Sequence, residues 1–113
     1  MTIVATVLAI ALPAPAAVCD QAHPVACIDA AAARWSVSGA VLRRKAWCES
    51  RMNPMAVGRA PVGRERALGL FQFLPSTWRT TPYRGRWIFS ARYSSLAAAW
   101  MHRVGRGGEW ACA

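Results

Sequence analysis

The sequence has few acidic residues and almost no lysine. Its 113 residues contain 14 Lys and Arg against 5 Asp and Glu, which gives a formal net charge of +9 at pH 7. Thirteen of the basic residues are arginine. Such an excess of positive charge favours an anionic partner, such as nucleic acid, an acidic membrane surface or an acidic cell-wall polymer. An arginine-rich genome would give the same composition, so charge alone does not choose a function.

The chain also lacks the features of a disordered or repetitive protein. Hydrophobic residues make up 55% of it and include 6 Trp and 3 Phe, which is too apolar for a disordered cationic tail. No internal repeat or long low-complexity stretch follows the first 18 residues. We therefore expect one small domain with a packed core. A covalent staple would be useful to a domain of this size, because it buries only about 60–70% of its unfolded surface.

Charged residues are absent from residues 1–18. An apolar run over residues 3–12 is followed by small residues and two prolines at 13–17, in an Ala-x-Ala arrangement. This order is typical of a secretory signal peptide that is cut near Ala16 or Ala17.

The sequence therefore predicts a signal peptide over residues 1–17 and a mature domain over residues 18–113. The expected signal lacks the Lys or Arg that usually follows Met1. A membrane anchor is the alternative, but the apolar run is short for a span. We expect a protein that is secreted or held in the cell wall, with no stable membrane span.

No Cys-x-x-Cys pair occurs and the two histidines are isolated, so neither a metal site nor another cofactor is expected. An even number of cysteines in a small exported chain predicts two disulfides, for which three pairings are possible. The pairing that we favour joins Cys19 to Cys27 and Cys48 to Cys112. The second bond would stabilise the fold by about 4 kcal/mol, because it closes a long loop.

Apolar residues recur at helical spacing in three segments, and Pro75 can open a shorter fourth helix through Trp78. Residues 54–68 are rich in Pro and Gly and read as a loop or an irregular hairpin. The expected fold class is mainly α (α+β). The longer helices begin near Pro24, after Ser38 and near Ser90, and end before Gly39, at Asn53-Pro54 and at Gly105.

Glu49 is the acid whose position suggests chemistry. On the second helix it shares a face with Leu42 and Ala46, so its carboxylate should point inward. Burial and the negative end of the helix dipole would both raise its pKa, as a general acid requires. The alternative is a structural glutamate that pairs with one of the arginines.

Three motifs follow one another in a recognisable order: Cys48-Glu49-Ser50, then Asn53-Pro54, then a Gly-Leu-Phe-Gln-Phe-Leu-Pro-Ser-Thr-Trp block over 69–78. Together they resemble the soluble lytic transglycosylase family. A further likeness is to its actinobacterial branch with the resuscitation-promoting factors, in which a Cys precedes the catalytic Glu and a terminal Trp-x-Cys returns to bridge it. Here that ending is Trp110-Ala111-Cys112, and the resemblance covers about Trp35 to Cys112.

The resemblance implies a lysozyme-like fold in which Glu49 lies in a cleft. It would act there as the catalytic acid on the β-1,4 bond between N-acetylmuramic acid and N-acetylglucosamine in peptidoglycan. Ser50 and Gln72, at matching positions, would orient Glu49 or bind the sugar. The alternative for Gln72 is a loop amide whose hydrogen bonds are satisfied within the protein.

One departure concerns the Ala-Tyr-Asn-Ala-Gly block that many family members carry in a later helix, where this chain has Ala97-Ala98-Ala99-Trp100-Met101. Aromatic rings pack well against the apolar face of a sugar, although helical spacing is also typical of core residues. The substrate-binding candidates are Ser50, Phe71, Gln72, Trp78, Tyr93 and Trp100.

Glycoside hydrolases usually need two carboxylates, and only Glu65 lies between the motif blocks. A lytic transglycosylase needs one Glu, as the resemblance implies, because the same residue serves as acid and base. Two alternatives therefore stay open: a lysozyme-type muramidase that uses Glu65, and a secreted cationic wall-binding or antimicrobial protein without catalysis. Nucleic-acid binding is disfavoured by export and disulfides.

The expected partner is the glycan strand of peptidoglycan, bound by a monomer. Anionic wall polymers are possible further partners of arginines beside the expected cleft, which otherwise form a solvated face. These arginines are Arg51, Arg59, Arg64 and Arg66.

Overall fold

The structure is a computed structural model that describes residues 2–12 and 17–112. Residues 2–12 form neither helix nor strand, and their side chains are exposed. The expected signal peptide falls partly outside the described residues, because Met1 and residues 13–16, with the expected cleavage position Ala16, are not among them. No helix over 2–12 and 17–112 is both long enough and apolar enough to span a bilayer.

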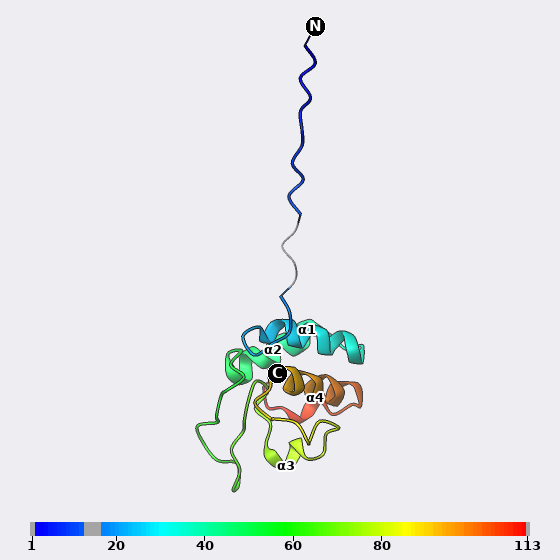
Figure 1. The fold of residues 1–113 in the computed structure, drawn as a ribbon. Coiled ribbons are helices and arrows are strands. Elements are labelled where there is room, and N and C mark those ends of the chain that lie inside the picture. Colours follow the sequence, from blue (N-terminus) through cyan, green and yellow to red (C-terminus); the bar gives the residue numbers. More distant parts are fainter. Residues whose placement is uncertain (1, 13–16, 113) are drawn as a thin grey trace.

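The folded body is mostly helical, which confirms the predicted fold class (Figure 1). Over the described ranges no extended strand forms, and three isolated antiparallel bridges in the middle of the chain represent the β component. The element bounds are α1 Pro24–Trp35, α2 Gly39–Ser50, α3 Pro75–Trp78, α4 Ala91–Arg103 and the 3-10 helix η1 Gly107–Glu109.

Local sequence signals explain where the helices begin and end. The hydroxyls of Ser38 and Ser90 accept hydrogen bonds from backbone N–H groups in the first turns of α2 and α4. Pro24 and Pro75 open α1 and α3, where the missing N–H has no intrahelical partner to lose. Arg51 has φ 54° and ends α2 in the left-handed conformation, so the chain turns away just after Glu49.

The core lies between α1, α2, α4 and the segment 70–78. In Figure 1, α1 and α2 lie together on one side of α4, and α3 lies on the other. The side of α4 that enters the core carries small residues, Ser94, Ser95 and 97–99, which let the neighbouring helix backbone approach closely. The remaining space is filled by larger side chains: Ile28, Leu42, Leu70, Phe71, Phe73, Trp78 and Met101.

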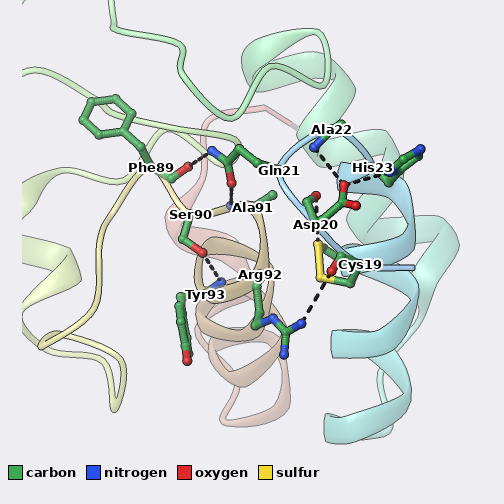
Figure 2. Close-up of a disulfide and its surroundings, with 11 residues drawn as sticks. Cys19, Asp20, Gln21, Ala22, His23, Phe89, Ser90, Ala91, Arg92 and Tyr93 are labelled. Carbon is green, nitrogen blue, oxygen red and sulfur yellow. Dashed lines mark hydrogen bonds and ion pairs between the residues drawn. A yellow bond between two sulfur atoms is a disulfide. The ribbon is translucent and has the colours of Figure 1, made fainter. Parts of the chain in front are cut away.

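Both disulfides form in the predicted pairing, Cys19 with Cys27 and Cys48 with Cys112. Figure 2 shows the first bond and the neighbouring Gln21, which lies against the start of α4. The Gln21 side chain donates to the carbonyl of Phe89 at 2.6 Å and accepts from the N–H of Ala91 at 2.8 Å. This disulfide loop therefore holds the start of α1 against the start of α4.

Candidate active site

Glu49 lies in the last turn of α2 and is partly buried. Burial raises the pKa of its carboxyl group, while a hydrogen bond from the Cys112 backbone and the positive charge of Lys45 act in the opposite direction. The net pKa lies above the usual value for glutamate. The carboxyl group therefore holds its proton more tightly than an exposed glutamate does.

The arginine pairing that was the alternative for Glu49 is not observed in the described chain. Each of the other four acids lies within 4 Å of a basic side-chain nitrogen, which for Asp20 is an imidazole that is charged only when protonated. Glu49 has no such partner among the described residues. Glu49 is thus the carboxylate whose charge is least committed to the fold. The four ion pairs are Asp20–His23, Asp29–Arg43, Glu65–Arg79 and Glu109–Arg106.

Ser50 fixes the end of α2 against the next motif. Its hydroxyl lies 2.8 Å from the carbonyl of Leu70 and 3.1 Å from that of Ala46, and it accepts from the N–H of Asn53 at 3.1 Å. One side chain thereby joins the Glu-Ser, Asn-Pro and Gly-Leu-Phe-Gln motifs. These contacts suit an orienting role for Ser50, since they leave its hydroxyl little capacity for a sugar.

Gln72 sits in a tight turn with φ 53°. Its amide nitrogen donates to the carbonyls of Ala56 and Gly69 at 3.2 and 3.0 Å, so this nitrogen is used within the protein. The turn begins at Gly69, which lies very close to the carbonyl of Ile88. A Cβ at this position would lie 2.8 Å from that oxygen, so the close approach requires glycine. Gln72 also lines a cavity of about 90 Å³ together with Trp110.

The C-terminal segment, residues 107–112, covers this region. The indole N–H of Trp110 donates to the carbonyl of Phe71 at 2.7 Å, and the ring stacks on His102 with centroids 5.8 Å apart. Cys112 is bonded to Cys48, and its backbone N–H lies near enough to Glu49 to lower the pKa of that carboxyl group. The end of the chain is therefore part of the environment of Glu49.

Sequence reasoning missed Lys45, which is only 6% exposed although it is charged. Its ammonium donates to the carbonyl of Gly107 at 2.7 Å and lies 4.7 Å from the centroid of the Trp110 ring. A signal was present, because Lys45 is three residues after Leu42 and four before Glu49, on the inward face of α2.

The structure corrects two of the aromatic predictions. Phe71 is 0% exposed and Trp78 is 5% exposed, so both belong to the core and offer no face to a sugar. Their rings pack edge-on against Trp110 and Phe73, respectively. Trp78 is a candidate because it follows the Gln72 block, but residues next to a turn can point inward.

The remaining aromatic candidates are partly buried and lie against arginines. The Arg86 guanidinium lies 4.9 Å from the ring centroid of Tyr93, and that of Arg106 lies 5.6 Å from Trp100. The most exposed tryptophans of the domain are instead Trp47 and Trp87, at 54% and 57% exposed.

No group of His, Cys, Asp and Glu within 2–12 and 17–112 is arranged to hold a metal ion.

A comparison with family models matches the transglycosylase SLT domain to residues 26–97. The match spans more than half of the chain and includes Glu49 and the Gln72 turn, but not the C-terminal segment. Searches of curated proteins and of solved structures find no match. The chain therefore belongs to the transglycosylase SLT domain family, whose common activity is the degradation of peptidoglycan.

Proposed function

We propose that this protein is a lytic transglycosylase that cleaves the β-1,4 bond between N-acetylmuramic acid and N-acetylglucosamine, with Glu49 as its single acid and base. The observation that carries the proposal is the environment of Glu49. Its carboxyl group is partly buried, has a raised pKa and lies where the family motifs meet the end of the chain. A carboxyl group in this state can give up a proton and take one back.

The chemistry needs one carboxyl group. Protonated Glu49 donates its proton to the glycosidic oxygen as the bond from that oxygen to C1 of the muramic acid residue breaks. The substrate's own acetamido group stabilises the positive charge that develops at C1. The 6-hydroxyl of the same sugar then attacks C1, and the Glu49 carboxylate accepts the hydroxyl proton. The products are a free N-acetylglucosamine end and a 1,6-anhydro ring.

The contacts of Glu65 support a one-carboxylate mechanism. One of its oxygens accepts from the backbone N–H of Ser76 at 2.9 Å, and the other accepts from the Ser76 hydroxyl. Arg79 lies 3.6 Å from the first oxygen. Glu65 thus connects its own loop, which lies between α2 and α3, to the first turn of α3. Both of its carboxylate oxygens form hydrogen bonds within the protein.

We therefore expect Glu65→Gln to keep its wall-cleaving activity within a few-fold of wild type. The substitution weakens the bonds to Ser76, so the free energy of unfolding should fall by about 1 kcal/mol. Urea unfolding and a muropeptide-release assay measure the two quantities. A loss of cleavage in a stably folded Glu65→Gln variant would instead support a two-carboxylate muramidase.

Product analysis tests the proposal directly. Mature protein incubated with purified peptidoglycan should release muropeptides that carry 1,6-anhydro-N-acetylmuramic acid, which are about 18 mass units lighter than the hydrolysed equivalents because no water is added. Mass spectrometry before and after borohydride reduction distinguishes the two, since only a hydrolase leaves a reducible muramic acid end. Reducible ends alone would overturn the transglycosylase proposal.

We also propose that the protein acts outside the cytoplasm, at the wall. The two disulfides support this placement, because such bonds persist in oxidising compartments. Among the arginines expected to bind anionic polymers, Arg51 lies over the Trp47 ring, and Arg66 donates to two backbone carbonyls. Arg59 and Arg64 are exposed in the same loop and are the better candidates for wall polymers.

A further inference from the structure

Lys45 is the sole lysine of the chain and is buried on α2. Placing an ammonium group in a desolvated position costs free energy unless its donors find partners. Burial accordingly lowers the pKa of Lys45. An apolar side chain of the same length would fill this position at lower cost. The presence of a charged lysine at this buried position therefore needs a reason.

Two groups receive the ammonium, and both belong to the C-terminal segment. They are the carbonyl of Gly107, at 2.7 Å, and the face of the Trp110 ring, at 4.7 Å. No carboxylate of the described residues lies within ion-pair distance of it. Lys45 thus holds down the beginning of the segment whose other end, Cys112, is bonded to α2.

The same segment reaches Glu49 at its far end, because Cys112 is bonded to Cys48, the residue before Glu49, and its backbone lowers the pKa of the Glu49 carboxyl group. Lys45 also lies four residues before Glu49 on α2, so the two side chains emerge on the same face one turn apart. The positive charge of Lys45 favours the ionised form of Glu49, and Glu49 in turn favours the charged form of Lys45. Lys45 therefore affects the proposed catalytic carboxylate in two ways, through the C-terminal segment that it binds and through its own positive charge.

We propose that Lys45 is a positioning residue for Glu49: it anchors the C-terminal segment that donates to the carboxylate and supplies a fixed positive charge one helical turn away. This inference rests on the proposed function of Glu49. Burial alone would raise the pKa of Glu49 further and disfavour the carboxylate form. Lys45 counteracts burial and favours the carboxylate that the second half of the reaction needs as its base.

Among the described residues, further charged or titratable groups lie beside the partners of Lys45. His102, on α4, stacks on the Trp110 ring, which is also the ring that the Lys45 ammonium contacts. Burial and the positive charge of Lys45 both lower the pKa of His102. From the segment around η1, Arg106 and Glu109 pair with each other. A pH titration of the site therefore contains a carboxyl step from Glu49 and an imidazole step from His102, and Glu109 adds a carboxyl step at lower pH because Arg106 lowers its pKa.

The first test is Lys45→Met, which keeps an unbranched side chain one atom shorter than lysine and removes its charge. We expect kcat on peptidoglycan to fall between about 10- and 100-fold, because the carboxylate loses its positioned donor. The alkaline limb of the pH profile should move to higher pH, since both lost interactions favoured the ionised form of Glu49. Arg44→Met is the matched control, as it removes an exposed charge from the same helix and should change neither quantity.

A purely structural lysine would give a different result. In that case Lys45→Met would lower the melting temperature and leave the pH limb of the remaining activity where it was. Wild-type activity with an unmoved pH limb in a folded Lys45→Met variant would overturn the inference. Failure of wild type itself to form anhydro products would overturn the proposed function instead, so the two outcomes are separate.

A second test needs no active variant. Protein labelled with [15N]lysine has one side-chain amine, so its Nζ signal can be followed by NMR through a pH titration without assignment. We expect an inflection from Glu49 that disappears in Glu49→Gln, while any step from His102 remains. Identical titration curves for the two proteins would mean that Lys45 does not sense Glu49, and the inference would fall.

Discussion

Glu49→Gln should reduce the cleavage of peptidoglycan by a factor of about 10²–10⁴, the usual contribution of a general acid and base. Gln has nearly the same shape as Glu and can still accept from the Cys112 N–H, but it cannot supply a proton to the leaving oxygen. The release of soluble muropeptides from purified sacculi, followed by chromatography, measures the loss. Because acid and base are one residue in this proposal, the substitution removes both steps together.

Asp29→Asn is the matched control for this substitution. It also neutralises a carboxylate that lies beside α2, but Asp29 is exposed and pairs with Arg43 on the surface. Its activity should stay within a few-fold of wild type. If Glu49→Gln kept full activity, the acid would be structural, and the secreted cationic wall-binding or antimicrobial protein would become the better hypothesis.

The fold of the Glu49→Gln variant can be checked by its pH dependence of stability. The folded pKa of Glu49 lies above its unfolded value, so the native state binds more protons than the unfolded state between the two. In wild type this group therefore lowers stability as pH rises from its unfolded pKa through its folded pKa. Glu49→Gln lacks this loss of stability, so we expect it to melt at or above the wild-type temperature at neutral pH. A melting temperature in that range would show that the variant is folded and that unfolding does not cause its inactivity.

The parts of the fold that the sequence predicted are those decided by local interactions. Ser38 and Ser90 cap their helices through side chains three residues away from the N–H groups that they bind. Pro24 and Pro75 likewise act within their own first turns. The inward direction of Glu49 followed from its spacing to Leu42 and Ala46, which is fixed by helix geometry.

The parts that could not be predicted depend on residues far apart in the chain. Phe71 and Trp78 have side chains that suit either a core or a sugar site, and their burial follows from packing against Trp110 and Phe73. The inward position of Lys45 is readable from its spacing, but its partner Gly107 is not, because it lies 62 residues later. Periodicity indicates which face of a helix is buried, but not which distant segment will cover it.

Removal of the second disulfide should have the largest effect on stability. Cys48 and Cys112 are separated by 64 residues, whereas Cys19 and Cys27 are separated by 8. In the chain-entropy model the double substitution of Cys48 and Cys112 by Ser lowers the free energy of unfolding by about 4 kcal/mol. The same treatment of Cys19 and Cys27 costs about 2.5 kcal/mol, because the loop that it opens is short. Urea unfolding of the two double variants measures the difference.

The two double variants should differ still more in activity. The backbone N–H of Cys112 lowers the pKa of Glu49, and the bond to Cys48 holds that N–H near the carboxylate. Freeing it should lower kcat about tenfold or more at a temperature where the protein remains folded. Loss of the Cys19–Cys27 bond acts at the start of α1 and should leave kcat near wild type. Equal activities in the two folded variants would show that the Cys112 donor is not needed, and Glu49 would then depend on α2 alone for its orientation.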